Sequence, residues 1–248
     1  NAPNGGSGTR WFAGSFDGRA FTAGSSTSWL DYGKDFYAAV TFSDVPDGRR
    51  ILMGWMSNWQ YAAKTPTGSW RGAMSLPREL ELVREDDRLL LRQCPVSSWT
   101  TSLKTVFEAR NPVLPFRRDA ADLTGSDIRL SLWEGEAGDI SIILSNASGE
   151  SLTFEFRGGN AYLDRRRSGL TGFSGDFAPC VQTMPLAGPL RDVRLIVDAS
   201  SAELFVNGGT STMTNLVFPE LPYTAVSIEG SRTIDNLIIG IPERGFPR

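Results

Sequence analysis

Charged and aromatic residues interrupt the apolar runs between Ser28 and Val83, a mixture that strands filling only a core do not need. Four of the seven tryptophans of the 248-residue chain fall in this segment: Trp29, Trp55, Trp59 and Trp70. Its charged residues include Asp31, Lys34, Asp35, Arg71, Arg78 and Glu79. An aromatic ring can cover the C–H face of a sugar, while carboxylates and ammonium groups bind the hydroxyls. The segment therefore predicts a carbohydrate site.

The elements expected to position these residues are short antiparallel strands. Residues 37–42 and 50–55 are rich in β-forming side chains, and the turn-forming run S-D-V-P-D-G separates them. Residues 79–84 alternate apolar and polar side chains, and Asp86-Asp87 turns the chain into residues 88–93. Strands of this length are typical of the blades of a β-propeller.

The second half of the chain, beyond a junction at residues 95–101, predicts a β-sandwich. Its strands repeat apolar side chains at every second position, for example at Ile128, Leu130 and Leu132, and at Leu152, Phe154 and Phe156. One apolar and one polar face per strand is what an antiparallel sandwich requires. Since no segment keeps a helical period over a dozen residues, the expected fold class is all-β.

Composition excludes several classes of function. A net charge of −3 and a pI near 5.2 argue against a nucleic-acid partner, which would need a basic face. The basic cluster Arg165-Arg166-Arg167 is interpreted as a solvated strand end. No run approaches the ~20 apolar residues needed to span a membrane. Histidine is absent, so acid–base chemistry would have to use carboxylates, lysine or tyrosine.

The two cysteines, Cys94 and Cys180, have no partner at the spacing of a metal site. No metal and no other cofactor is therefore expected. The sequence leaves open whether the two cysteines pair with each other.

Three long segments resemble glycoside hydrolase family 32, the invertases, levanases and exo-inulinases that cleave β-fructofuranosides. They are D-Y-G-K-D-F-Y-A-A at residues 31–39, G-W-M-S-N-W-Q-Y at 54–61 and W-R-G-A-M-S-L-P-R-E-L at 70–80. Later segments such as L-D-R-R-R-S-G extend the likeness to the second half. The resemblance implies about the last two blades of a five-bladed β-propeller over residues 1–95, followed by an antiparallel β-sandwich over residues 96–248.

The same resemblance places Asp31 and Lys34 in the sugar pocket and favours Trp55 and Trp59 as its aromatic wall. An alternative for Asp31 and Lys34 is a surface ion pair at a strand start. The alternative for either tryptophan is burial between blades. Arg78 is interpreted as a structural bridge between blades rather than a substrate ligand.

The catalytic carboxylates of the family are not found in the chain, so no catalytic residue is assigned. A retaining glycosidase needs a nucleophile and an acid/base carboxylate about 5 Å apart. The family carries them in W-M-N-D-P-N-G and an E-C motif, with a further aspartate in R-D-P. Here Gln93 precedes Cys94 and Pro179 precedes Cys180, and neither Arg-Asp pair is followed by proline. We expect the first three or so blades to be missing from this chain.

Two functional hypotheses follow. The first is the C-terminal part of a β-fructofuranosidase acting on sucrose, inulin or levan. It would be inactive alone and completed by an N-terminal polypeptide or by self-association through the open blade face. The second is a non-catalytic fructan-binding or structural β-sandwich module. The family implies an extracellular or periplasmic location, although no signal peptide opens this chain, and neither nucleic acid nor a membrane is an expected partner.

Overall fold

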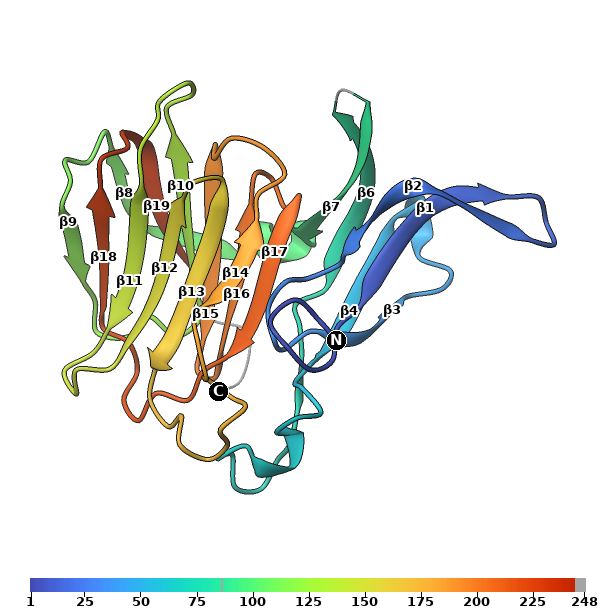
Figure 1. Ribbon diagram of the computed structural model, residues 1–248. Helices are drawn as coiled ribbons and strands as arrows, with labels where there is room; N and C mark the ends of the chain where they lie inside the picture. The colour runs from blue at the N-terminus through green and yellow to red at the C-terminus, as the bar shows by residue number, and fades with distance from the viewer. Residues whose placement is uncertain (86, 244–248) are drawn as a thin grey trace.

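Two six-stranded sheets make a β-sandwich, and a smaller group of strands packs beside it (Figure 1). This computed structural model describes residues 1–85 and 87–243. All of the strand pairs found in these residues are antiparallel, as the alternating sequence pattern predicts. The predicted all-β fold is confirmed.

The N-terminal strands form two separate sheets. A two-stranded sheet holds β1 (Arg10–Phe16) and β2 (Phe21–Trp29). A five-stranded sheet holds, in order, β3 (Tyr37–Thr41), β4 (Arg50–Met56), β6 (Arg78–Glu85) and β7 (Arg88–Pro95), with β5 (Ala73–Met74) paired to β4. Short 3-10 turns, η1 (Pro46–Gly48) and η2 (Ala62–Lys64), lie in its connections. These sheets do not close into a ring, in agreement with the predicted partial propeller.

The sandwich begins after α1 (Ser97–Thr101), a single helical turn in the predicted junction. Its first sheet holds, from edge to edge, β17 (Ser211–Leu216), β16 (Ser201–Val206), β15 (Asp192–Asp198), β10 (Ser126–Leu132), β19 (Ile234–Pro242) and β8 (Leu103–Arg110). Its second sheet holds β14 (Gln182–Pro185), β13 (Asn160–Arg167), β12 (Ser151–Arg157), β11 (Ile140–Ser145), β18 (Ala225–Gly230) and β9 (Phe116–Asp119). No helix within residues 1–85 and 87–243 has the length and apolar character to cross a membrane.

Side chains from the facing sheets meet in one apolar core. Ile128 and Leu130 of β10 and Phe154 and Phe156 of β12 are buried there, while the residues between them lie at or near the surface. The alternation in the sequence therefore assigns these faces correctly.

β16 and β17 depart from this pattern because every residue of both strands is buried. One face of these strands fills the sandwich core, and the other lies against the N-terminal sheets. Figure 1 shows β17 at the edge of the sandwich nearest β6 and β7. This edge is the interface between the two parts of the molecule.

The N-terminal sheets leave large apolar side chains exposed on their outer faces. The exposed residues with the largest accessible fractions in these sheets and their turns are Phe16 (67%), Val40 (70%) and Trp59 (72%). Phe12, Phe21, Phe42, Met74 and Leu82 are also exposed. Their exposure is typical of faces on which another element packs. It agrees with the open arc of blades expected from the sequence.

β2 is a strand that the sequence pattern does not predict, because F-T-A-G-S-S-T-S-W lacks the usual apolar alternation. The turn expected at Asp86-Asp87 lies partly outside the described residues, since residue 86 is not among them.

Candidate functional site

Trp55 and Trp59 form an aromatic pair on the outer side of the five-stranded sheet. Their ring centroids lie 4.9 Å apart with planes tilted by 51°, and the Tyr37 ring meets Trp55 edge-on at 6.5 Å. Trp55 is half-buried, while 72% of the Trp59 surface is exposed. We call Trp55 and Trp59 the aromatic wall. A solvent-facing indole beside a second ring can stack on a sugar.

The local sequence sets the direction in which Trp55 points. On β4 the buried side chains Leu52 and Met56 face inward, so Trp55 lies on the opposite face of the strand. Gly72 lies against the edge of this indole and has a backbone φ of +73°. A Cβ atom at Gly72 would lie 2.5 Å from Trp55 Nε1, so only glycine fits there.

Trp59 is exposed, but the residue before it is anchored. Asn58 is fully buried, and its Nδ2 donates hydrogen bonds to the carbonyl oxygens of Lys34 (2.8 Å) and Gly5 (3.3 Å). Its Oδ1 accepts a hydrogen bond from the backbone N–H of Gln60 at 3.0 Å. These bonds tie the turn to the N-terminal loop and to the Lys34 segment, so the wall has a defined position.

Lys34 lies behind this turn rather than on the surface. Its Nζ donates to Gln60 Oε1 at 3.1 Å and to the carbonyl oxygen of Asp176 in the sandwich at 2.6 Å. Burial, helped by repulsion from Arg165, lowers the pKa of Lys34 below its ordinary value. The predicted contact of Lys34 with sugar remains a prediction, because both bonds use the ammonium group within the protein.

Asp31 is buried at the interface with the sandwich. Its Oδ2 accepts hydrogen bonds from Arg78 Nη1 at 2.9 Å and Thr214 Oγ1 at 2.7 Å. Its Oδ1 accepts from the backbone N–H groups of Thr214 and Gly33, each at 2.8 Å. The alternative of a surface ion pair with Lys34 is wrong, because Asp31 pairs with Arg78 inside the molecule. Sugar binding by Asp31 remains a prediction.

Arg78 centres a buried cluster that joins the five-stranded sheet to the sandwich. Its Nη2 donates to Glu203 Oε2 of β16 at 2.7 Å, and its Nη1 reaches Gln93 Oε1 at 3.3 Å. The rings of Phe36 and Phe205 lie over the guanidinium at 4.4 and 4.9 Å. Burial would lower the pKa of Arg78, but the two carboxylates outweigh it and raise that pKa. Arg78 is thus a structural bridge, from blade to sandwich rather than between blades.

A second buried cluster surrounds Arg165 of β13. Its Nη1 donates to Asp35 Oδ2 at 2.6 Å, its Nη2 to Tyr61 Oη at 2.9 Å, and its Nε to the carbonyl oxygen of Phe177 at 3.0 Å. Tyr61 Oη in turn donates to Asp35 Oδ1 at 2.6 Å. Burial first, and then the charge of Asp35, raise the pKa of Tyr61 well above its ordinary value. The Arg165 cluster fixes the end of the turn that carries Trp59.

The interpretation of residues 165–167 as a solvated strand end is wrong for Arg165, which is fully buried, while Arg166 and Arg167 are exposed. The sequence contained an indication of this burial. Arg165 lies two and four residues after the core residues Leu163 and Ala161 on β13, so its side chain points to the same face. Glu203 was also missed. Phe205 lies two residues after Glu203, on the same outward face of β16. An apolar residue at that position indicates that this face is covered.

The structure therefore brings Trp55 and Trp59 together and connects Lys34 to the same turn through Gln60. Asp31 belongs instead to the Arg78 cluster. Within residues 1–85 and 87–243, no three Cys, Asp or Glu side chains group as a metal site would require. Both cysteines are free thiols.

Two family models match the chain: "Glycosyl hydrolases family 32 N-terminal domain" at residues 2–95 and "Glycosyl hydrolases family 32 C terminal" at residues 91–238. The levanase of Bacillus subtilis is 35% identical over 237 residues, which are 88% of this chain and 35% of the levanase. The extracellular exo-inulinase of Aspergillus ficuum is 32% identical over 233 residues, covering 86% of this chain and 43% of that protein.

Solved structures agree with these sequence matches. The exo-inulinase of Aspergillus awamori superposes with a TM-score of 0.85 at 27% identity, covering 98% of this chain and 52% of that one. The β-fructofuranosidase of Schwanniomyces occidentalis, complexed with fructosyl-erythritol, superposes at 0.79 with 29% identity, covering 96% and 54%. The chain thus spans about half of the length of these two solved relatives. It spans 35% and 43% of the length of the two curated relatives. Since the two models together match most of the chain, it belongs to glycosyl hydrolase family 32.

Proposed function

We propose that this chain is the C-terminal part of a β-fructofuranosidase-type hydrolase that cleaves fructosyl bonds in sucrose, inulin or levan. The observation that carries the proposal is the aromatic wall, which stands in the G-W-M-S-N-W-Q-Y segment of a family 32 chain and faces solvent. Similar structures hold fructosyl-erythritol and fructosylnystose, which is consistent with a fructoside ligand.

The residues of the site have different roles in this proposal. Trp55 and Trp59 contact the sugar, because an indole face matches the C–H face of a fructosyl ring. Lys34 holds the Trp59 turn through Gln60, and its third N–H donor is the one that it would offer to the sugar. Asp31 acts through the Arg78 cluster, which fixes the sheet that carries Trp55.

Hydrolysis requires carboxylates that a further segment supplies. The carboxylates of Asp31, Asp35 and Glu203 are each paired with a buried arginine, so they are held in interfaces and not placed as a free nucleophile and acid. We therefore expect the chain on its own to be inactive. The exposed apolar faces around Phe16 and Val40 are where a preceding propeller segment would pack.

Fructose release tests the proposal. The chain alone, incubated with sucrose, inulin and levan, should release no fructose above the blank. A chimera that joins the preceding segment of the Bacillus subtilis levanase to this chain should release fructose. A folded chimera that releases none would refute a catalytic partnership. Saturable binding of fructans without hydrolysis in that chimera would favour the alternative of a binding module.

We also propose an extracellular or periplasmic location. Support comes from relatives that are named extracellular exo-inulinases, since polymeric fructans are available outside the cell. Detection of the native protein in the culture medium or periplasmic fraction, with a cytosolic marker absent, would test it.

A further inference from the structure

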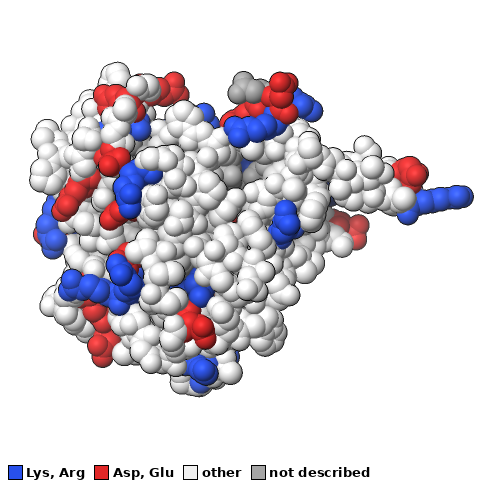
Figure 2. All heavy atoms as spheres, in the orientation of Figure 1, with Lys and Arg blue, Asp and Glu red and all other residues white. Residues whose placement is uncertain are grey.

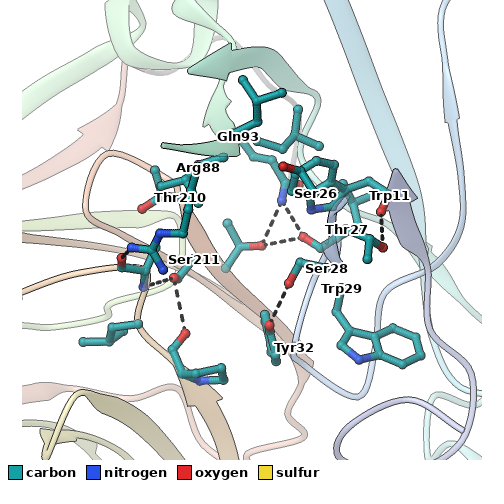
Figure 3. Close-up of a pocket in the computed structure, with 18 of the residues that line it drawn as sticks. Trp11, Ser26, Thr27, Ser28, Trp29, Tyr32, Arg88, Gln93, Thr210 and Ser211 are labelled. Carbon is teal, nitrogen blue, oxygen red and sulfur yellow. Dashed lines mark hydrogen bonds between the residues drawn. The ribbon is translucent and has the colours of Figure 1, made fainter. Parts of the chain in front are cut away.

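A cavity of about 380 Å³ lies where the β1–β2 hairpin, the β6–β7 hairpin and the sandwich edge meet (Figure 3). Its walls come from β2, from the start of β7, from residues 185–187 at the end of β14 and from residues 210–212 at the start of β17. This volume falls within the range of small-ligand pockets, roughly 300–1,000 Å³. Neither residue of the aromatic wall lines it, so the cavity is separate from the site proposed above.

The wall supplied by β2 is rich in hydroxyl groups. Ser25, Ser26, Thr27 and Ser28 are consecutive and all line the cavity. Because side chains alternate along a strand, those of Ser26 and Ser28 share one face, and a strand selected only for packing would carry apolar residues there. This is the reason why the sequence pattern did not predict β2.

Hydrogen-bonding capacity remains at the cavity wall. Ser28 Oγ and Tyr32 Oη lie 2.9 Å apart, and because a hydroxyl donates one bond and accepts two, each can still bind another group. Ser211 Oγ already accepts from the backbone N–H of Ala187 at 3.2 Å and donates to the carbonyl oxygen of Pro185 at 3.4 Å. Arg88 Nη2 donates to the Ala187 carbonyl oxygen at 3.1 Å. Arg88 keeps four further N–H donors. Figure 3 shows these groups around one space.

An aromatic ring completes the lining. Trp11 is half-buried and pairs with Ser28 across the β1–β2 hairpin, so its side chain lies on the same face as that of Ser28. Trp29 also borders the cavity, but its ring lies on the opposite face of β2, where the Arg10 guanidinium is 5.4 Å from the ring centroid. Indoles next to hydroxyl groups are the combination that binds the two sides of a sugar ring. A purely apolar ligand would leave the hydroxyls without partners.

Charge argues against an ionic ligand. The charged residues that line the cavity within the described chain are Arg88 and Asp87, one of each sign and both exposed. On the side of the molecule drawn in Figure 2, uncharged atoms cover most of the centre. A phosphate or a carboxylate would find no excess of positive charge here.

We propose that this cavity is a second carbohydrate site, which holds fructosyl units of a fructan chain away from the aromatic wall. That the sugar is a fructan rests on the proposed function; that it is an uncharged oligosaccharide rests on the cavity alone. A site of this kind would raise the affinity for long chains by holding two parts of one molecule.

The seven tryptophan indole N–H signals of the ¹⁵N-labelled chain test both sites in one NMR titration. Short inulin-type and levan-type fructo-oligosaccharides are added, and malto-oligosaccharides serve as the sugar control. Saturable shifts of the Trp11 and Trp29 signals are expected with the fructo-oligosaccharides. Shifts of Trp55 and Trp59 report on the proposed function separately, so each site can fail without the other.

Ser26→Tyr should fill the cavity and weaken the Trp11 and Trp29 response at least tenfold, leaving Trp55 and Trp59 unchanged. The matched control Ser148→Tyr, on an exposed turn of the sandwich, should change neither. Arg88→Gln, at the exposed rim, gives a second test with little risk to folding and should weaken the response several-fold.

The proposal is overturned if Trp11 and Trp29 show no saturable shift, or if Ser26→Tyr and Arg88→Gln both bind as the parent does. Equal responses to malto-oligosaccharides would overturn the assignment to fructans.

Discussion

Replacing Arg165 with methionine tests whether the buried clusters hold the blades to the sandwich. Methionine keeps most of the length of the aliphatic stem but removes all of the guanidinium donors. Asp35 would then remain buried as a carboxylate with Tyr61 Oη and the Leu216 N–H as its partners, at 2.6 and 2.9 Å. The Phe177 carbonyl oxygen would lose two donors.

Removal of one partner from a buried ion pair leaves an uncompensated charge and costs about 3–5 kcal/mol. Arg166 is the matched control, since it lies next in sequence and pairs with Asp164, but with 54% of its side chain exposed. An exposed pair of this kind contributes about 0–1 kcal/mol. Because a domain is stable by only about 5–15 kcal/mol, the difference between the two variants is large on the scale of the whole protein.

Urea unfolding followed by tryptophan fluorescence and far-ultraviolet circular dichroism measures both costs. Arg165→Met should lower the free energy of unfolding by about 3–5 kcal/mol and Arg166→Met by at most about 1 kcal/mol. Adding Asp35→Asn to Arg165→Met should recover part of the loss, because it removes the orphaned charge. Equal costs for Arg165→Met and Arg166→Met, or no recovery in the double variant, would refute the structural role of this cluster.

Two further predictions concern pH and local stability. Burial lowers the pKa of Lys34, so the unfolded chain binds its proton more readily in the pH window just below 10.5. Lys34 therefore makes the free energy of unfolding rise as pH increases through that window, and Lys34→Met should remove this rise when chemical unfolding is compared at pH 7 and pH 10. An unchanged pH dependence in the variant would contradict the shift. Hydrogen exchange should be faster in β1 and β2, which are mostly exposed, than in β11 and β12 of the sandwich core. Equal protection in a verified monomer would contradict this ordering.

Sequence reasoning predicted the architecture because two signals were local. The period of two in strands such as β10 and β12 assigns their core faces, and the turn-forming runs separate the strands. Trp55 and Trp59 were assigned to one aromatic wall by the family resemblance of residues 54–61, and β4 and the turn after it place their ring centroids 4.9 Å apart.

The rest depended on contacts between distant parts of the chain. Asp31 and Arg165 find their partners 47 and 130 residues away, at Arg78 and Asp35, and no local pattern encodes such pairs. A charged residue on the outward face of a strand is interpreted as solvated unless the sheet that covers this face is known. The hydroxyl-rich β2 was missed for a related reason, because its faces are set by a cavity and not by an apolar core.

The proposed function depends on this chain supplying the aromatic wall of a fructosidase site. Its most direct test is kcat/KM for sucrose and inulin in the levanase chimera, with Trp59→Ala compared with Trp133→Ala, an exposed tryptophan of the sandwich. Loss of a stacked ring costs about 1–3 kcal/mol, so Trp59→Ala should lower kcat/KM about tenfold to a hundredfold. Trp133→Ala should leave it unchanged. A folded chimera that is equally active with and without Trp59 would contradict the claim.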